Sequence, residues 1–380
     1  MLKERIGMFK KEEIKVQVIS NPDQTIECSW NELVSQSCEN PFLLRSFVLQ
    51  LMKSSYLTGY SGLILVFSYG ERIIGIAPLM ERKRLGVRYV KFTNKFVYSP
   101  DLIVDDKNRH ILISLVLNFL FKNLNCKFVE FSLPIESPTF SILKEQCKAK
   151  GIHFKVASEM GHRILPVSCS WNEFQSLRGK NFRQQFKKAE KKLEQAGSWK
   201  TECVAGNEEN GVIERILDVE RRSWKDVWRN QNGNHVDEDL MTVLNASQTT
   251  AKNEPAFKWK VWFLELNDQT IAYLLVIQYK NKAYLTKTSY DEKYRKFYPG
   301  QFLRKSVIFD LFTEGQTNTI DFLTDLPHHQ TWTSLCKQRA TITMAKGVIP
   351  NFVQSTFGSK FLISGKKWLI NRFFLRNAKT

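Results

Sequence analysis

The tetrapeptide Tyr298-Pro299-Gly300-Gln301 has the composition of a site for phosphate groups. The pattern of the chain predicts that a helix begins here and runs through 301–314, and backbone N–H groups at the start of a helix attract anions. Proline favours entry into a helix, and glycine lets the backbone approach a ligand closely. Pro-Gly can also simply turn the chain into a helix. Three cations nearby in sequence add to the positive charge: Arg295, Lys296 and Arg304.

Titratable residues in the second half of the chain are candidates for a general base or a proton relay. The catalytic candidates are Glu220, Asp321 and His328. Each also has an ordinary structural explanation, because most titratable side chains serve ion pairs, loops or solvent-facing turns. Four further side chains are candidates for holding a substrate: Trp224, Lys225, Asp325 and His329. An oxyanion would also need a donor, commonly a backbone N–H at an irregularity of a sheet, which a sequence does not reveal.

Several familiar catalytic patterns are missing from the chain. It has no nucleophile elbow, no G-x-x-x-x-G-K-[ST] loop and no G-x-G-x-x-G fingerprint. The seven cysteines are scattered, odd in number and never spaced as C-x-x-C, which argues against a zinc site and a disulfide framework. Hydrolase, nucleotide triphosphatase, dehydrogenase and metalloenzyme functions are therefore disfavoured, and we expect no metal.

The elements that must position these residues occur twice in one order. In the first half, the pattern predicts strands, a helix and a closing strand at 63–69, 72–80, 88–92, 108–122 and 127–133. In the second half, the same series falls at 261–266, 270–279, 283–290, 301–314 and 319–323. An ordered series that repeats at one offset indicates a tandem duplication. We expect a mixed α/β fold of two tandem domains.

The two domains are placed at residues 1–160 and 161–380, and only the second is expected to bind a phosphate-bearing cofactor. In the first, the equivalent segment lacks glycine and carries Asp101, Asp105 and Asp106 where the helix begins. Carboxylates there stabilise a helix by about 0.3–1 kcal/mol, but they repel a phosphate. We therefore interpret the first domain as a degenerate copy that does not bind the cofactor.

Positive charge is concentrated in two segments of this chain, whose formal net charge is +18. Such a charge attracts anionic cofactors, nucleic acids and lipid surfaces alike. One basic segment, 178–200, lies on a predicted amphipathic helix. The other is the tail, whose last part, 366–379, has the composition of a segment that lies on an anionic membrane or packs on its own protein. The apolar positions of the predicted helix are Phe182, Phe186, Ala189 and Leu193.

The start of the chain, MLKERIGMFKKEEIK, is charged where a secretory signal needs an apolar core. The longest nearly apolar stretch, 112–121, is too short to span a bilayer. We therefore expect a cytoplasmic protein, or one peripheral to the inner face of the membrane.

Four segments carry a family resemblance when taken in order and spacing: 170–177 continuing through Lys180, Arg183, Leu193 and Gly197; Glu220 with 223–225; Pro299-Gly300 with Leu303; and 321–323. Together they resemble the tandem GNAT acyltransferases of the CelD/BcsL type, which are related to Fem-type aminoacyltransferases. The resemblance spans 41–343 and is strongest in the second half. After the closing strand the family has a glycine and a Tyr-Lys pair, whereas this chain has Asp325 and His328-His329, a departure that bears on acceptor or acyl specificity.

Such proteins look like two GNAT folds side by side, in which an acyl-CoA and an amine meet in the second. The resemblance implies N-acylation, with acetyl-CoA as the expected donor, of an amino sugar, an amino acid or a cell-envelope or polysaccharide precursor. Two alternatives remain: an inactive GNAT-fold protein that binds nucleic acid or anionic lipid, and a Fem-type transferase that uses aminoacyl-tRNA. The chain has no pair of long charged heptad helices like the Fem-type arm and no aromatic-interleaved RNA motif, which favours free acyl-CoA over nucleic acid.

Overall fold

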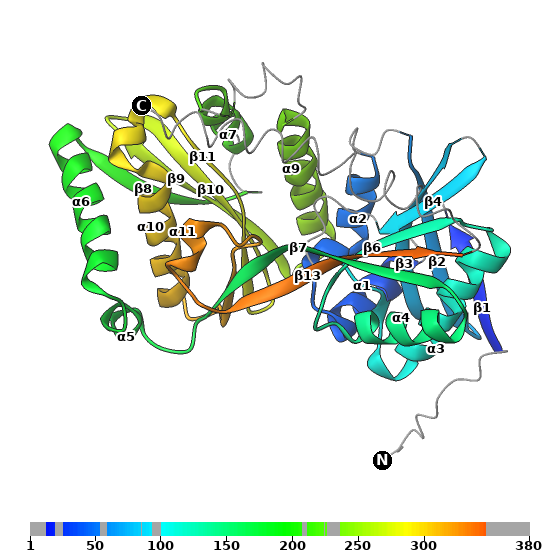
Figure 1. Cartoon of the computed structure of the whole chain (residues 1–380). Helices are drawn as coiled ribbons and strands as arrows, with labels where there is room; N and C mark the ends of the chain where they lie inside the picture. The colour runs from blue at the N-terminus through cyan, green and yellow to red at the C-terminus, as the bar shows by residue number, and fades with distance from the viewer. Residues whose placement is uncertain are drawn as a thin grey trace, which may run out of the picture.

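The computed structural model describes residues 13–19, 26–53, 59–84, 86–92, 100–206, 211–223, 225 and 236–346. Within these residues, thirteen strands form one continuous sheet in the order β1-β2-β3-β4-β6-β13-β7-β12-β11-β10-β9-β8, with β5 paired to β3. Helices lie on both sides of this sheet (Figure 1). The fold is mixed α/β, as predicted, and its two lobes are parts of a single sheet.

The first lobe contains the first copy of the repeated series. Its elements are β1 (Ile14–Ile19), α1 (Glu27–Ser37), η3 (Pro41–Leu43), α2 (Arg45–Met52), β2 (Ser61–Tyr69), β3 (Arg72–Arg84), β4 (Val87–Phe92), β5 (Ile103–Val104), α3 (Asp106–Asn118), η5 (Phe119–Asn123), β6 (Phe128–Pro134) and α4 (Pro138–Ala149). The predicted helix at 108–122 is α3 continued by one turn of π-helix, η5.

A long strand, β7 (His153–Pro166), leads into the second lobe. The elements that follow are α5 (Trp171–Ser176), α6 (Lys180–Ala196), β8 (Trp199–Ala205), α7 (Val212–Arg221), α9 (Val236–Asn253), β9 (Phe257–Leu266), β10 (Gln269–Tyr279), β11 (Lys282–Tyr290), η6 (Glu292–Phe297), α10 (Pro299–Thr313), β12 (Thr319–Asp321), α11 (Pro327–Gln330) and β13 (Cys336–Ala345). The second series of strands and its helix confirm the predicted order.

The last described strand returns to the first lobe. β13 lies between β6 and β7 and pairs antiparallel with both, while the end of β7 pairs with β12 of the second lobe. The two strands cross the middle of the molecule side by side (Figure 1). The sequence-based boundary between residues 160 and 161 falls inside β7. This strand contributes to both lobes, and β13, from the second half of the chain, pairs with β6 of the first lobe.

Three apolar cores hold the helices on the sheet. One packs α3 and α4 against the first lobe, and a second packs α5, α6 and α10 against the second lobe. The third lies between the lobes, where α1, α2, α7 and α9 cover the other face. The predicted apolar positions of α6 are all buried in the second core: Phe182, Phe186, Ala189 and Leu193.

Gly161 allows β7 to bend where it passes β13. The register of the two strands shifts here, between Lys337 and Arg339. A Cβ at Gly161 would lie 2.5 Å from the carbonyl oxygen of Lys337 and 2.9 Å from Sγ of Cys336. Because the closest obstacle is backbone, a larger residue must push the two strands apart.

We expect Gly161→Ala to lower the free energy of unfolding by about 1–3 kcal/mol, the usual effect of overpacking. Urea denaturation measures it. Gly179→Ala is the control, because a Cβ there meets nothing within 4 Å. Its free energy of unfolding should fall by less than that of Gly161→Ala. Equal stability of Gly161→Ala and the wild type would show that the crossing is not tightly packed.

Candidate functional site

Strand β11 has an open edge over most of its length. It pairs in parallel with β12 only at Lys282–Tyr284, against Thr319–Asp321. From Leu285 to Tyr290 no described strand pairs with this edge, although the other edge stays paired with β10. Unpaired backbone groups on a strand edge can bind an extended ligand. The open edge is therefore a place where a chain-like molecule can enter the sheet.

The same strand contains a β-bulge at Thr286. Leu285 pairs with Val276 and Lys287 with Leu275, so that Thr286 is the extra residue opposite β10. Its hydroxyl donates to the carbonyl oxygen of Leu275 at 3.0 Å. Bulges interrupt the ladder and occur beside active sites. A backbone N–H at such an irregularity is a common donor to an oxyanion, and the sequence of the strand did not reveal this bulge.

Helix α10 begins beside Tyr290, at the end of the open edge. The sequence predicts a helix start at this place. Tyr298 has left-handed φ and ψ values of 56° and 44° and precedes Pro299, the first helical residue. The N–H groups of Gln301 and Phe302 both donate to the carbonyl oxygen of Tyr298. Because proline has no N–H, Gly300 carries the first-turn N–H that has no backbone acceptor among the described residues.

The glycine at position 300 has no evident structural reason within the protein. Its φ is not positive, and an added Cβ would come no closer than 3.4 Å, to a ring carbon of Tyr290. A glycine inside a helix costs about 0.5–1 kcal/mol relative to alanine. The absence of a side chain here is consistent with a ligand that approaches the backbone.

The start of α3 in the first lobe is occupied by the protein's own carboxylates. Asp105 accepts hydrogen bonds from the backbone and side-chain N–H groups of Asn108, at 2.9 and 3.0 Å. Asp101 and Asp106 form ion pairs with Arg109. The two lobes therefore differ at this place as the sequence suggested: α3 is capped internally and α10 is not.

Glu220, near the end of α7, is a buried carboxylate held by two donors. The residue is 2% exposed. The hydroxyl of Tyr273 donates to its Oε1 at 2.5 Å, and Nζ of Lys225 lies 3.2 Å from the same oxygen. The same lysine donates to the carbonyl oxygen of Thr288, on the open part of β11, at 2.7 Å. Glu220 and Lys225, which the sequence named as separate catalytic and substrate-binding candidates, are thus brought together beside β11. Trp224 lies outside the described residues.

Tyr273 was not foreseen as a member of this cluster. It lies in the middle of an apolar strand, where its pattern is that of a core residue. The only sequence signal is a hydroxyl-bearing side chain on the face that α7 covers, and that face becomes known only with the register of β10.

Asp321, at the end of β12, forms a second buried cluster with a residue that the sequence analysis missed. Both its oxygens lie 2.9 Å from Nδ1 of His162, and its Oδ1 accepts from the N–H of Leu323 at 2.7 Å. Asp321 is 7% and His162 5% exposed. The antiparallel pairing of β12 with β7 brings the two residues together. They are 159 positions apart, so no local pattern could connect them.

The two adjacent histidines lie on α11, beside α10. His329 is buried, stacks on Phe322 with ring centroids 4.8 Å apart and lies 3.0 Å from the hydroxyl of Thr324. Burial, and then the charge of Arg304, lowers the pKa of His328 to about 4 and that of His329 to about 3. Both rings are therefore neutral at pH 7, and His328 is a weak base there.

Asp325 links the segment between β12 and α11 to β7 through an ion pair with Arg163. Its Oδ1 accepts from Nε of Arg163 at 2.5 Å and from Gln330 at 3.2 Å. The hydrogen bond from Arg163 lowers the pKa of Asp325 below its ordinary value. In this structure the carboxylate already has protein partners, which is the structural role expected of an ion pair.

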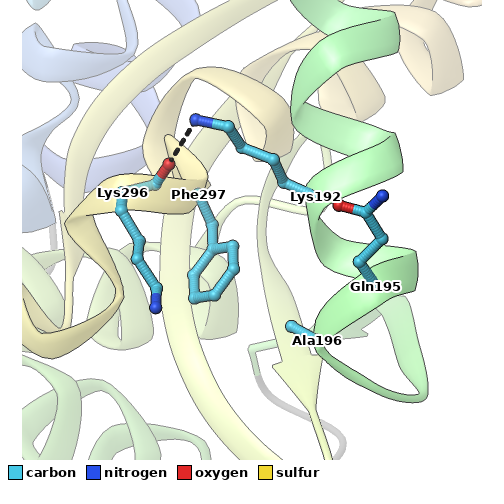
Figure 2. Close-up of a pocket in the computed structure, with 5 residues that line it drawn as sticks. All are labelled: Lys192, Gln195, Ala196, Lys296 and Phe297. Carbon is cyan, nitrogen blue, oxygen red and sulfur yellow. Dashed lines mark hydrogen bonds between the residues drawn. The ribbon is translucent and has the colours of Figure 1, made fainter.

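A shallow cavity of about 300 Å³ lies between α6 and η6, just before α10. Figure 2 shows its walls: Lys192, Gln195 and Ala196 from α6, and Lys296 and Phe297 from η6. Nζ of Lys192 donates to the carbonyl oxygen of Lys296 at 3.0 Å and lies 4.7 Å from the ring centroid of Tyr298. Of the three cations that the sequence placed near the phosphate site, Lys296 lines this groove, Arg295 is exposed and Arg304 is buried.

Polar side chains continue into the first lobe, on the face opposite the core under α3 and α4. We call them the polar band: Glu159, Arg339, Ser132, Glu130 and Lys91. Arg339 donates to Ser132 at 2.7 Å. Burial raises the pKa of Glu130 and lowers that of Lys91. The band is therefore a partly desolvated surface of both charges.

The polar band lies on the side of the sheet that carries the buried carboxylates. Lys337 and Arg339 are two positions apart on β13, so their side chains point to the same face of the sheet. His162 pairs with Lys337 and therefore points to that face too. Asp321 pairs with Tyr284, whose ring belongs to the core under α7 and α9. Asp321, the end of α7 and the polar band therefore share one face of the sheet.

No group of histidine, cysteine, aspartate and glutamate side chains suited to a metal ion occurs in the part of the chain that the structure describes. Over the same residues, no helix is both long and apolar enough to cross a membrane.

The chain is similar to known proteins in part of its sequence and in its fold. Residues 180–331 match the family of the acetyltransferase (GNAT) domain. FemX has a similar structure, with a TM-score of 0.58 and 11% identity over 91% of this chain and 100% of that chain. A conserved protein of unknown function from Bacteroides thetaiotaomicron has a TM-score of 0.55 and 10% identity, over 87% and 100%. L-PGS from Bacillus licheniformis has a TM-score of 0.54 and 9% identity, over 86% and 93%.

At such low identities the structural likeness concerns the fold alone, and no curated protein sequence gives a significant match. The family match covers α6 through α11, the part that contains Glu220, the open edge of β11 and the start of α10. Residues 180–331 therefore match a GNAT domain, within a two-lobed chain of mixed α/β fold.

Proposed function

We propose that the protein is an acyl-CoA-dependent N-acyltransferase, with acetyl-CoA as the donor. The observation that carries the proposal is the position of the open edge of β11, Leu285–Tyr290, between the start of α10 and the Glu220 cluster. A thioester on a long flexible arm, with a pyrophosphate at its far end, fits this order of features. The match of residues 180–331 to acetyltransferase domains supports the same chemistry.

The cofactor is proposed to lie with its pyrophosphate at the first turn of α10 and its pantetheine arm along the open edge of β11. The N–H of Gly300 and the helix dipole favour the phosphates. The residues proposed to bind the cofactor are Arg295, Tyr298, Pro299, Gly300, Gln301 and Arg304. Lys192 and Lys296, in the neighbouring groove, add positive charge where the nucleotide end would emerge.

In the proposed reaction, a neutral amine attacks the thioester carbonyl, the C–N bond forms and the C–S bond then breaks, releasing CoA. Glu220, linked to Tyr273 and Lys225, accepts the proton of the acceptor ammonium, directly or through the tyrosine hydroxyl. A backbone N–H at the Thr286 bulge stabilises the oxyanion of the tetrahedral intermediate. Asp321 and His162 form a second candidate relay, and neutral His328 a third.

The acceptor is proposed to lie on the polar band, which shares its face with Glu220 and Asp321. Partly desolvated charges of both signs suit an amine-bearing molecule with several polar groups, such as an amino sugar, an amino acid or an envelope precursor. Lys225 and Asp325 already have protein partners, so we assign them positioning roles. His329 and Trp224 stay predicted substrate contacts.

A donor of the aminoacyl-tRNA kind is the second candidate, favoured by the structural likeness to FemX. A phosphate site at α10 would serve either donor, since both carry phosphates. Attachment to an anionic membrane through 366–379 also stays a prediction, because that segment lies outside the described residues. Binding of acetyl-CoA, measured against an RNA of the tRNA acceptor-stem sequence, separates the two donors.

We expect Gly300→Asp to abolish binding of acetyl-CoA in titration calorimetry. The substitution puts a carboxylate where the phosphates are proposed to lie, and like charges repel. Gly300→Ala is the matched comparison: the protein leaves room for its Cβ, and because it adds no charge it should weaken binding less than Gly300→Asp does. Asp106→Ala, at the exposed start of α3, should have no effect. Full binding by Gly300→Asp would rule out the phosphate site.

We expect Glu220→Gln to lower turnover at least about tenfold, equivalent to about 1.4 kcal/mol of barrier, with little change in acetyl-CoA affinity. The measurement is release of free thiol in the presence of a panel of amino sugars and amino acids. Glu265→Gln is the control, because Glu265 is also an ion-paired carboxylate of the second lobe, bound to Arg215 and Lys200. Unchanged turnover in Glu220→Gln would remove this residue from the mechanism.

A further inference from the structure

Helix α6 carries a face of lysines opposite the stripe of residues that it buries. The buried positions of α6 follow the spacing of one helix face, starting at Phe182. The same spacing started two residues earlier, which is about half a turn around the helix, gives a face that is exposed along its whole length. We call it the lysine face, and it consists of Lys180, Gln184, Lys187, Lys188 and Lys191.

The charge of the lysine face is not balanced by the described residues. None of its four lysines forms an ion pair with a described carboxylate, and the two acidic residues of α6, Glu190 and Glu194, lie outside the face. Like charges four positions apart, such as Lys187 and Lys191, repel one another and weaken a helix. An anionic surface placed against the lysine face would relieve this repulsion.

The lysine face is accessible from outside the molecule. Figure 1 shows α6 as the outermost helix of the second lobe, and its buried stripe packs in the same core as α10. From Lys180 to Lys191 the face is about 17 Å long, at a rise of 1.5 Å per residue. A broad charged surface can therefore contact all four lysines at once.

A large apolar side chain is exposed near the first lysine of this face. Leu177, in the turn between α5 and α6, is 80% exposed, more than any other large apolar residue that the structure describes. A lone exposed leucine is ordinary. A leucine close to a row of lysines, however, is the combination found in segments that lie in a membrane interface.

The composition of the lysine face favours lipid headgroups over nucleic acid. The face has neither an arginine nor an aromatic ring, whereas nucleic-acid sites use the arginine fork and stack bases on rings. Lysine is a strongly hydrated point charge on a flexible stem, which suits headgroups that move in the plane of a membrane. A small anion would cover only part of a face of this length.

We propose that the lysine face and Leu177 bind an anionic membrane surface, with α6 lying along the headgroups and the leucine reaching into the apolar boundary below them. The inference goes beyond acyl transfer and does not depend on it. It concerns described residues and is separate from the tail at 366–379. The groove between α6 and η6 is formed by the same helix, so docking brings the proposed donor site close to the lipid.

The test is co-sedimentation of the full chain with vesicles of phosphatidylcholine, with and without phosphatidylglycerol. We expect the wild type to prefer the anionic vesicles and to lose most of this binding at high salt, because ions screen exposed charges. Replacing the four lysines with glutamine should lower the partition coefficient about tenfold or more. This α6 variant carries Lys180→Gln, Lys187→Gln, Lys188→Gln and Lys191→Gln.

A matched control removes the same number of charges from exposed lysines of the first lobe. It should bind anionic vesicles like the wild type, because these lysines lie on other elements of the fold. An equal loss in both variants would mean that net charge alone drives binding, and the proposal would fail. The control carries Lys107→Gln, Lys127→Gln, Lys144→Gln and Lys148→Gln.

Leu177→Ala tests the apolar contact by itself. We expect about threefold weaker binding to anionic vesicles with an unchanged dependence on salt, because the lost contact is apolar. Wild-type binding by this variant would overturn the proposed insertion of the leucine.

Two further outcomes would overturn the proposal. If the α6 variant bound anionic vesicles like the wild type, the attraction would come from another part of the chain, such as the tail. If it lost more affinity for an RNA of unrelated sequence than for the vesicles, the lysine face would serve nucleic acid. Acyl transfer is measured without vesicles, so the proposed function stands or fails separately.

Discussion

The structure depends on the pairing of β7 with strands of both lobes. One stretch of β7 pairs with β13 and the next with β12, so a single strand fixes the position of each lobe relative to the other. The same pairing brings His162 to Asp321 and places both on the face that the end of α7 covers. Because side chains alternate along a strand, a slip of one residue would turn this whole set away.

The two lobes have similar elements but differ in which polar groups have partners within the described residues. In the first lobe, α3 is capped by Asp105 and its Arg109 is paired. In the second, α10 starts without a side-chain cap, its buried Arg304 has no partner among the described residues and the adjacent strand has an open edge. A folded domain tolerates few such features, and here they gather along one strand and one helix.

The sequence was sufficient for the elements of the two repeated series and for helix α6, and insufficient for most contacts. Apolar periodicity located the strands of both series and the buried face of α6, and Pro299-Gly300 located the start of α10, because these signals are local. The insertion of β13 into the first lobe, the bulge at Thr286 and the pairing of His162 with Asp321 depend on register between distant segments. Tyr273 was hidden for the same reason, since a tyrosine in an apolar strand looks like any core residue.

The return of β13 has a consequence for how the chain acquires its structure. A hydrogen bond such as that from Arg339 to Ser132 joins residues 207 positions apart, and closing so long a loop is slow. During synthesis, β6 emerges from the ribosome long before its neighbour exists, and its edge stays exposed until almost the whole described chain has been made. The first lobe must therefore wait for the second, and an exposed strand edge in the meantime is a site for aggregation or for binding by a chaperone.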